Sequence, residues 1–147
     1  MQNKLAARRK FVATGLRPDV TPVEIYKSDG EFGQIVKIIG KGATGNGVTG
    51  YEFGSSHRTK LRRASNKITS AHSRWLCYRF DKPSDALPIE GGSGSGDSGG
   101  PILIKAQKDW LLAGLTSWAY PQSAIRTPGR YGQFTCSVRL SLLHRLD

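Results

Sequence analysis

The sequence contains few of the residues on which several common protein classes depend. It has two cysteines, three histidines and one methionine in 147 residues, too few cysteines for a disulfide-dense scaffold or a four-cysteine zinc site. No apolar run could span a membrane, and the N-terminus lacks the continuous apolar segment of a signal peptide. No Asp or Glu precedes Asp19, and no internal repeat is visible. We therefore expect no metal, no cofactor and no membrane partner.

Basic residues, by contrast, are in excess. The chain has 22 Lys and Arg against 11 Asp and Glu, a net charge of +11, which attracts polyanions at physiological salt. Part of this charge is concentrated in one stretch that contains Arg58, Lys60, Arg62, Arg63 and Lys67. No aromatic residues alternate with these cations as they do in a base-stacking platform. The stretch is predicted to be a solvated loop and nucleic acid an unlikely partner, with a nucleic-acid or glycan surface as the alternative.

Glycine and proline indicate an all-β chain. Eighteen glycines and seven prolines separate short apolar runs, a pattern typical of strands joined by turns in a single domain. The predicted strands are Val20–Tyr26, Gln34–Ile39, Trp75–Phe80, Pro101–Lys105, Trp110–Trp118 and Tyr131–Val138. Because Val138, Leu142 and Leu146 recur every four residues, residues 138–146 are predicted to form a short closing helix.

The most informative segment is Gly-Asp-Ser-Gly-Gly-Pro at residues 96–101. A serine that attacks a carbonyl needs two backbone N–H groups aimed at the developing oxyanion, and flanking glycines allow the tight turn that presents them. Ser98 is the candidate nucleophile. The N–H groups of Gly96 and Ser98 are the candidate oxyanion hole, and Asp97 is expected to support the loop.

This hexapeptide resembles the nucleophile motif of the trypsin/chymotrypsin-like serine proteases. Three other elements match that family in order and spacing: Ile39–Gly42 resembles its Gly-Trp-Gly turn, 112–120 its Ser-Trp-Gly strand, and 128–131 its Pro-Gly-x-Tyr element. The resemblance implies that Ser117, Trp118 and Ala119 line the substrate site, with Gly129 on the opposite wall. It also places Gly92, six residues before the nucleophile, at the floor of the specificity pocket.

The resemblance implies a fold and a function as well. The fold is an antiparallel six-stranded Greek-key barrel with a short C-terminal helix, the second half of a chymotrypsin-like double barrel. Residues 20–147 would form this barrel, and residues 1–19 would be a remnant of the first barrel and the connection between the two. The implied function is a secreted or periplasmic serine endopeptidase that cleaves peptides or proteins through an acyl-enzyme on Ser98. Because Gly92 is uncharged, apolar side chains such as Leu, Met or Phe are expected before the scissile bond.

The histidine and aspartate of the catalytic triad are missing at the expected spacing. In the family the Asp precedes the nucleophile by about 90–100 residues and the His by more, which places the Asp at or just before residue 1. We therefore expect the chain by itself to be inactive or nearly so, and a missing N-terminal half is a candidate partner. The alternative is a non-catalytic protease-like binding module with a basic surface.

Two local features resemble known functional motifs without fitting them. Thr69–Ser73 imitates the family's catalytic histidine motif, but His72 is only 26 residues before the nucleophile, so a solvent-facing loop residue is expected. Residues 40–45 match the dinucleotide fingerprint GxGxxG, yet further glycines follow where a helix must start.

Cys77 and Cys136 are expected to be ordinary thiols, with a disulfide between them as the alternative. His57 and His144 have no carboxylate at a telling spacing.

Overall fold

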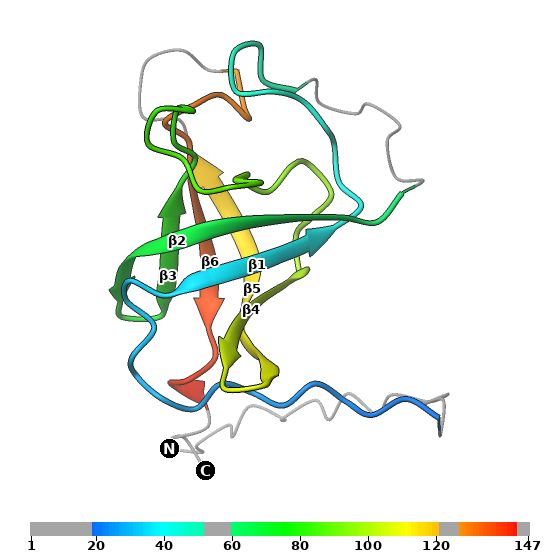
Figure 1. Ribbon diagram of the computed structural model, residues 1–147, viewed down its shortest axis with the longest axis vertical. Helices are drawn as coiled ribbons and strands as arrows, with labels where there is room; N and C mark the ends of the chain where they lie inside the picture. The colour runs from blue at the N-terminus through cyan, green and yellow to red at the C-terminus, as the bar shows by residue number, and fades with distance from the viewer. Residues whose placement is uncertain (1–18, 52–59, 121–126, 144–147) are drawn as a thin grey trace, which may run out of the picture.

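The computed structural model describes residues 19–51, 60–120 and 127–143, and within them six strands form a closed antiparallel barrel. The strands are β1 (Ile35–Gly40), β2 (Arg62–His72), β3 (Trp75–Arg79), β4 (Pro101–Ala106), β5 (Asp109–Tyr120) and β6 (Phe134–Arg139). Their order around the barrel is β1-β2-β3-β6-β5-β4, so the chain between β3 and β4 crosses one end of the barrel (Figure 1). This is the Greek-key barrel that the sequence predicts.

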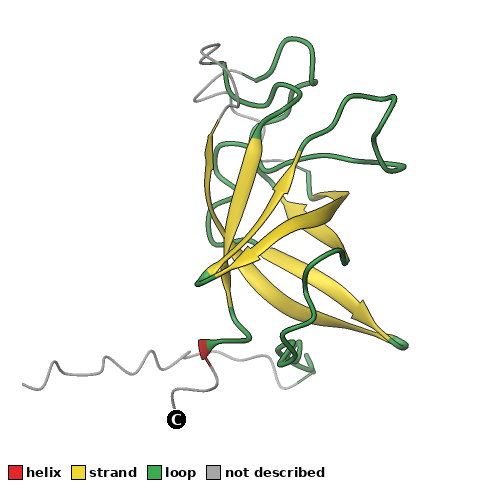
Figure 2. Ribbon diagram, turned by 90° about the vertical axis from the view of Figure 1, so that its left-hand side faces the viewer, coloured by secondary structure: helices red, strands yellow, loops and turns green. Residues whose placement is uncertain are grey.

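Alternating apolar side chains fill the barrel. Val36 and Ile38 of β1 point inward with Ile102 and Ile104 of β4, because successive side chains of a strand face opposite sides. Ile68, Leu76, Tyr78 and Ala113 complete this buried core. Figure 2 shows the strands wrapped around it, with long loops gathered at one end of the barrel. These are the loops that follow β1 and β3 and precede β6 (Figure 1).

Two strand predictions were wrong. Residues 20–26 form no strand and contribute one isolated bridge, between Ile25 and Leu112. The sixth strand is instead β2, part of which was predicted to be a solvated basic loop. Its inward positions include the polar Asn66, whose amide is buried and donates to the backbone oxygens of Arg79 and Gly91. A half-polar inner face conceals the alternation by which strands are recognised.

The closing helix is also absent from the described residues. Val138 belongs to β6 and pairs with Trp75 on one side and Leu115 on the other. The strand ends at Arg139, and only a short helical turn follows, near Leu143 (Figure 2). Residues 144–146 of the predicted helix lie outside the described ranges. None of the described segments forms a helix long and apolar enough to cross a membrane.

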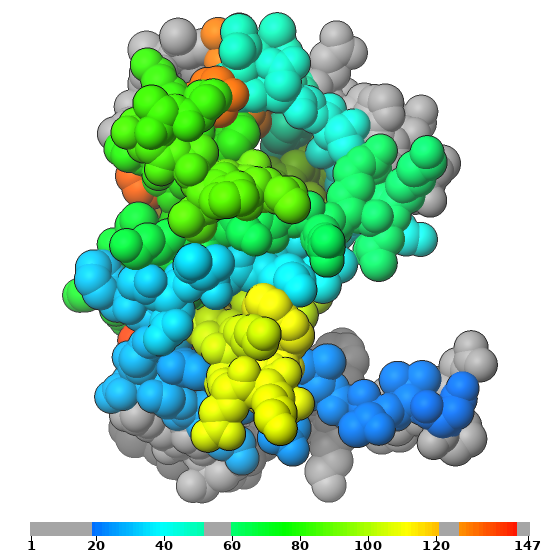
Figure 3. All heavy atoms as spheres, in the orientation of Figure 1, coloured from blue at the N-terminus to red at the C-terminus, as the bar shows by residue number. Residues whose placement is uncertain are grey.

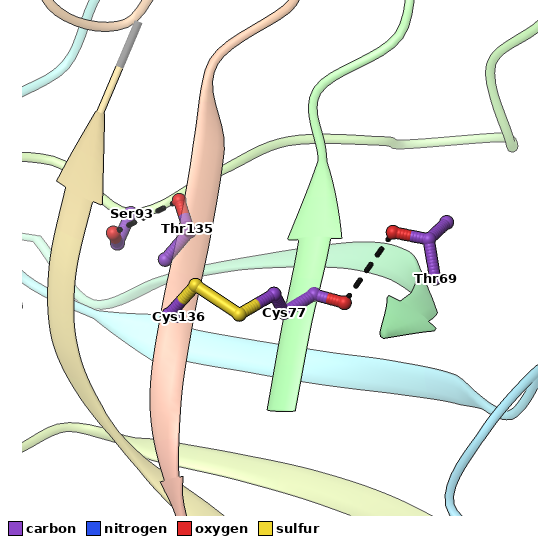
Figure 4. The surroundings of a disulfide bond; sticks show 5 residues. All are labelled: Thr69, Cys77, Ser93, Thr135 and Cys136. Atoms are coloured by element: carbon purple, nitrogen blue, oxygen red, sulfur yellow. Dashed lines mark hydrogen bonds between the residues drawn. A yellow bond between two sulfur atoms is a disulfide. The ribbon is translucent and has the colours of Figure 1, made fainter. Parts of the chain in front are cut away.

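The two cysteines form a disulfide, which corrects the expectation of free thiols. Cys77 of β3 and Cys136 of β6 are directly opposite each other in the ladder, with a Cα–Cα distance of 4.2 Å (Figure 4). Such short distances are typical of facing residues in antiparallel strands. The two residues are 59 apart in sequence, so only the strand pairing brings them together.

A buried ion pair ties the chain before β1 to the end of β6. Glu31 is fully buried and accepts hydrogen bonds from Arg139 Nε at 2.9 Å and from its terminal nitrogen at 2.6 Å. The Ser141 hydroxyl donates to the same carboxylate at 2.5 Å. Burial by itself raises the pKa of Glu31, but these hydrogen bonds outweigh it, and the pKa lies below its ordinary value. The carboxylate is therefore ionised inside the fold.

Candidate nucleophile loop

The loop of residues 92–100, between β3 and β4, is held in place by the carboxylate of Asp97. One oxygen accepts the Gly42 N–H at 2.7 Å and the other accepts the Gly94 N–H at 2.8 Å. A Cβ at Gly42 would lie 2.5 Å from the Asp97 carboxyl carbon, so only glycine allows this approach. The Gly100 N–H donates to the Asp97 carbonyl at 2.9 Å and closes the turn around Ser98. Asp97 thus connects the loop after β1 to the turn that carries the serine.

The turn exposes Ser98 together with two backbone donors. Gly96 and Gly99 have φ values of 95° and 79°, a region that residues with a side chain rarely adopt. Gly96 and Ser98 are both exposed, and neither backbone N–H donates to any residue of the described ranges. Acyl transfer requires two backbone N–H groups of this kind, aimed at the developing oxyanion.

Main-chain pairing places this turn beside β5. The Gly99 N–H donates to the Thr116 carbonyl at 2.7 Å, and the Thr116 N–H donates to the Gly100 carbonyl at 2.8 Å. These bonds extend the β4–β5 ladder by one step beyond Pro101. Ser98 therefore lies next to the chain that continues through Ser117, one of the residues predicted to line the substrate site.

The predicted substrate residues of β5 are exposed. Ser117, Trp118 and Ala119 all lie on the surface at the end of the strand. The Trp118 ring meets Trp75 edge-on with centroids 5.6 Å apart and stacks on Tyr120 at 5.2 Å. These ring contacts fix the position of the exposed Trp118 side chain.

The other predicted pocket residues, Gly92 and Gly129, come from different loops but both lie beside the Gln133 side chain, whose amide nitrogen would be 3.8 Å from a Cβ at Gly92. Gly92 lies over β6, where a Cβ would be 3.5 Å from the Thr135 hydroxyl, and Ala119 faces the same Thr135 in the ladder. The Thr135 hydroxyl is also within 3.4 Å of Ser93 Oγ (Figure 4). Gly129 lies in the turn before β6 instead, where its N–H donates to the Gln133 side chain at 2.6 Å. Thr135 is the residue that sequence reasoning missed, because the register of β6 was not known.

The glycine-rich loop after β1 braces the serine loop and forms no nucleotide-binding helix. The Ala43 N–H donates to the Ser95 carbonyl at 2.8 Å, and the Tyr51 N–H donates to the Pro128 carbonyl at 3.0 Å. Burial raises the pKa of Tyr51, and the Asp97 carboxylate raises it further. Tyr51 therefore stays a neutral phenol that packs between Gly129 and the serine loop.

A cavity of about 230 Å³ lies behind the serine turn. Its lining includes Gly42, Tyr51, Gly92, Asp97 and Gly129, but not Ser98 or the β5 residues Ser117–Ala119. The Asp97 carboxylate thus faces the cavity, whereas Ser98 is exposed and does not line it. No group of three His, Cys, Asp or Glu side chains in the described ranges could hold a metal ion.

His72 is placed far from the serine. It ends β2, is exposed, and faces Trp75 across the turn into β3. β1 separates β2 from β4 in the barrel, and the β2–β3 turn and the chain entering β4 lie on opposite sides of the molecule (Figure 1). His57 and His144 lie outside the described residues.

The fold and the serine loop agree with the comparison to known families. The family model described as Trypsin matches residues 13–139. The chain belongs to the trypsin family. Membership of the trypsin family accounts for the closed six-stranded barrel.

A solved structure of the same family supports the fold. Neuropsin, a serine protease expressed in the limbic system of mouse brain, matches with a TM-score of 0.52 and 19% sequence identity. The match covers 87% of this chain and 55% of the neuropsin chain. This trypsin-family chain therefore spans about half the length of that protease, and at this identity the likeness shows the fold alone.

Proposed function

We propose that residues 20–147 are the nucleophile-bearing barrel of a serine endopeptidase. The observation that carries this proposal is the exposed Ser98 on a turn anchored by Asp97. On the same turn, the N–H groups of Gly96 and Ser98 donate to no residue of the described ranges. In the proposed reaction the Ser98 hydroxyl attacks the scissile carbonyl, and the two N–H groups stabilise the oxyanion. An acyl-enzyme on Ser98 forms, the amine leaves, and water then releases the acyl group.

The serine needs a base that the described residues do not bring to it. Without one, the hydroxyl keeps its proton at neutral pH and is a weak nucleophile. We propose that a first barrel supplies the histidine and the aspartate, and that residues 1–19 are the end of that barrel and its connection. A peptide or protein substrate would then bind between the two barrels.

The proposed substrate site favours apolar side chains. Gly92 carries no charge, and its nearest neighbours are Thr135, Gln133 and Phe80. Ser117, Trp118 and Ala119 would bind the substrate backbone on one side, and Gly129 is the proposed second wall. A Leu, Met or Phe side chain before the scissile bond suits this uncharged floor better than Arg or Lys, because the nearby Asp97 and Glu90 carboxylates already accept backbone N–H groups.

The Cys77–Cys136 disulfide supports a secreted or periplasmic location. Disulfides persist in oxidising compartments and are rare in the reducing cytosol. Members of the trypsin family are typically secreted, and we propose the same for this protein.

Labelling with a fluorophosphonate tests the nucleophile. The chain is expected to label no faster than its Ser98→Ala variant, because no base activates the hydroxyl. Expression together with the region encoded upstream of residue 1, if that region holds an in-frame His and Asp, should produce rapid labelling that Ser98→Ala abolishes. A serine that stays unreactive in that longer protein would contradict the endopeptidase proposal. Rapid labelling of the 147-residue chain alone would contradict the missing-base argument and direct attention to His72.

A second candidate is a non-catalytic binding module with a basic surface. Three adjacent strands carry cations and no acidic residue, which favours this function. The retained serine turn favours the protease, because a binding module needs neither a nucleophile nor free oxyanion donors. The labelling experiment separates the two candidates.

A further inference from the structure

One face of the barrel is built from strands that carry cations but no acidic residue. β4, β1 and β2 are neighbours in the barrel, and their residues include no Asp or Glu. Their cations are Lys37, Arg62, Arg63, Lys67 and Lys105. In Figures 1 and 3, β1 and the long strand β2 lie across the side of the molecule that faces the reader.

Strand alternation brings four of these cations to the outer face. Since Val36, Ile38 and Ile68 point into the core, Lys37, Arg63 and Lys67 point outward. Lys37 faces Ser65 in the ladder, midway between Arg63 and Lys67. Arg63 and Lys67 are four residues apart, about 13 Å along an extended strand.

Lys105 extends the row onto the next strand. Ile104 points into the core, so Lys105 points outward, and it is exposed. β4 pairs with β1 on the side away from β2. The charges therefore run across three strands, so that a long polymer could contact several of them at once.

The acidic side chains next to these strands are turned away or already engaged. Asp109 is opposite Ala106 at the tip of the β4–β5 hairpin. Because the neighbouring pair Lys105 and Trp110 points outward, strand alternation turns Asp109 to the other side. The Glu90 carboxylate accepts the backbone N–H groups of Asp81 and Leu87, both at 2.7 Å. Within the described part of the chain, none of the cations Lys37, Arg63, Lys67 and Lys105 forms an ion pair with a carboxylate.

The chemistry of the face distinguishes between polyanions. Trp110 is the aromatic residue beside it, and the Lys37 ammonium lies 3.8 Å above the centre of that ring. The ring face under this ammonium is not free to stack on a nucleobase, and such stacking gives single-stranded nucleic acid much of its affinity. The Cys77–Cys136 disulfide indicates an oxidising compartment outside the cytosol, where the long polyanions that a protein meets include sulfated polysaccharides.

We propose that the outer face of β4, β1 and β2, centred on Lys37, Arg63, Lys67 and Lys105, binds a linear sulfated polysaccharide. Sulfate groups remain ionised at all physiological pH values, so each contact is an ion pair that releases a counterion. Binding does not involve Ser98, so the proposal is independent of the proposed peptidase activity.

The test uses the 147-residue chain and heparin as the probe, with affinity measured over a range of salt concentrations. The variant Lys67→Gln/Lys105→Gln removes one exposed cation from each outer strand of the face. The control Lys27→Gln/Lys82→Gln removes the same charge from exposed positions outside the six strands. The face variant is expected to bind heparin about tenfold more weakly, and the slope of log affinity against log salt should fall by about two, one for each lost contact. The control should change affinity less than twofold.

Equal losses in the two variants would overturn the proposal, since net charge alone would then explain binding. Undiminished binding by the face variant would also overturn it. A single-stranded DNA with the same number of charges and an anionic lipid vesicle serve as competing probes. Preference for either of these over heparin would contradict the sulfated polysaccharide as ligand, whereas neutral dextran should not bind at all.

Discussion

Replacing Glu31 by Gln should destabilise the barrel far more than its small change in shape suggests. The carboxylate is fully buried and pairs with Arg139, whose side chain is only 10% exposed. Glutamine retains one acceptor oxygen, but its amide group places a second donor against the guanidinium. Breaking a buried pair by removing one partner costs about 3–5 kcal/mol, because the remaining charge is left unpaired in the interior. That is a large part of the roughly 5–15 kcal/mol by which domains are stable.

The pH dependence of this effect follows from the direction of the pKa shift. The pKa of Glu31 is lowered in the folded protein, so the ionised carboxylate contributes stability that is fully present above the unfolded pKa of about 4.3. This contribution is lost as the pH falls through the lower, folded pKa. The difference in unfolding free energy between the native protein and Glu31→Gln should therefore be largest near neutral pH and shrink below pH of about 4.

Urea denaturation followed by tryptophan fluorescence measures the effect, and Asp81→Asn is the matched control. Asp81 pairs with Arg79 at 2.5 Å, but the two side chains are 23% and 42% exposed, so its loss should cost no more than about 1 kcal/mol. Should Glu31→Gln not fold, Glu31→Leu/Arg139→Met is expected to recover a cooperative transition, because it removes both charges. Equal midpoints for Glu31→Gln and Asp81→Asn at neutral pH would refute the reasoning.

Two further predictions concern the disulfide and the serine loop. Cys77→Ala/Cys136→Ala should lower the unfolding free energy by about 4 kcal/mol, which is the chain-entropy value for closing a loop between residues 59 apart. Urea denaturation measures this change. A decrease in unfolding free energy of less than about 1 kcal/mol would show that the disulfide does not constrain the unfolded chain. Gly42→Ala should displace the Asp97 carboxylate and cost about 1–3 kcal/mol, with faster amide hydrogen exchange in the serine loop. Gly30→Ala is its control, since the nearest atoms to an added Cβ there are 3.5 and 3.6 Å away; equal exchange in both variants would contradict the anchoring role of Asp97.

Much of the fold was readable from the sequence because it depends on local patterns. Short apolar runs such as Ile35–Gly40 and Pro101–Ala106 indicate strands by themselves, and the Gly96–Pro101 turn is specified by residues that are adjacent in the chain. Each of these signals needs only a few consecutive residues. The trypsin-family resemblance added the prediction that these strands form an antiparallel Greek-key barrel.

The tertiary structure decided what depends on register and on distant partners. The Arg62–His72 strand was missed because its inward Asn66 gains its partners only when β3 and the loop after it are in place. The disulfide joins residues 59 apart, and the Asp97 carboxylate meets an N–H group 55 residues away. Neither spacing carries a local signal, because nothing in a single sequence states which strands lie opposite each other. The pairing of strands also placed Arg63 and Lys67, interpreted from the sequence as part of a solvated loop, on one outward face with Lys37 and Lys105.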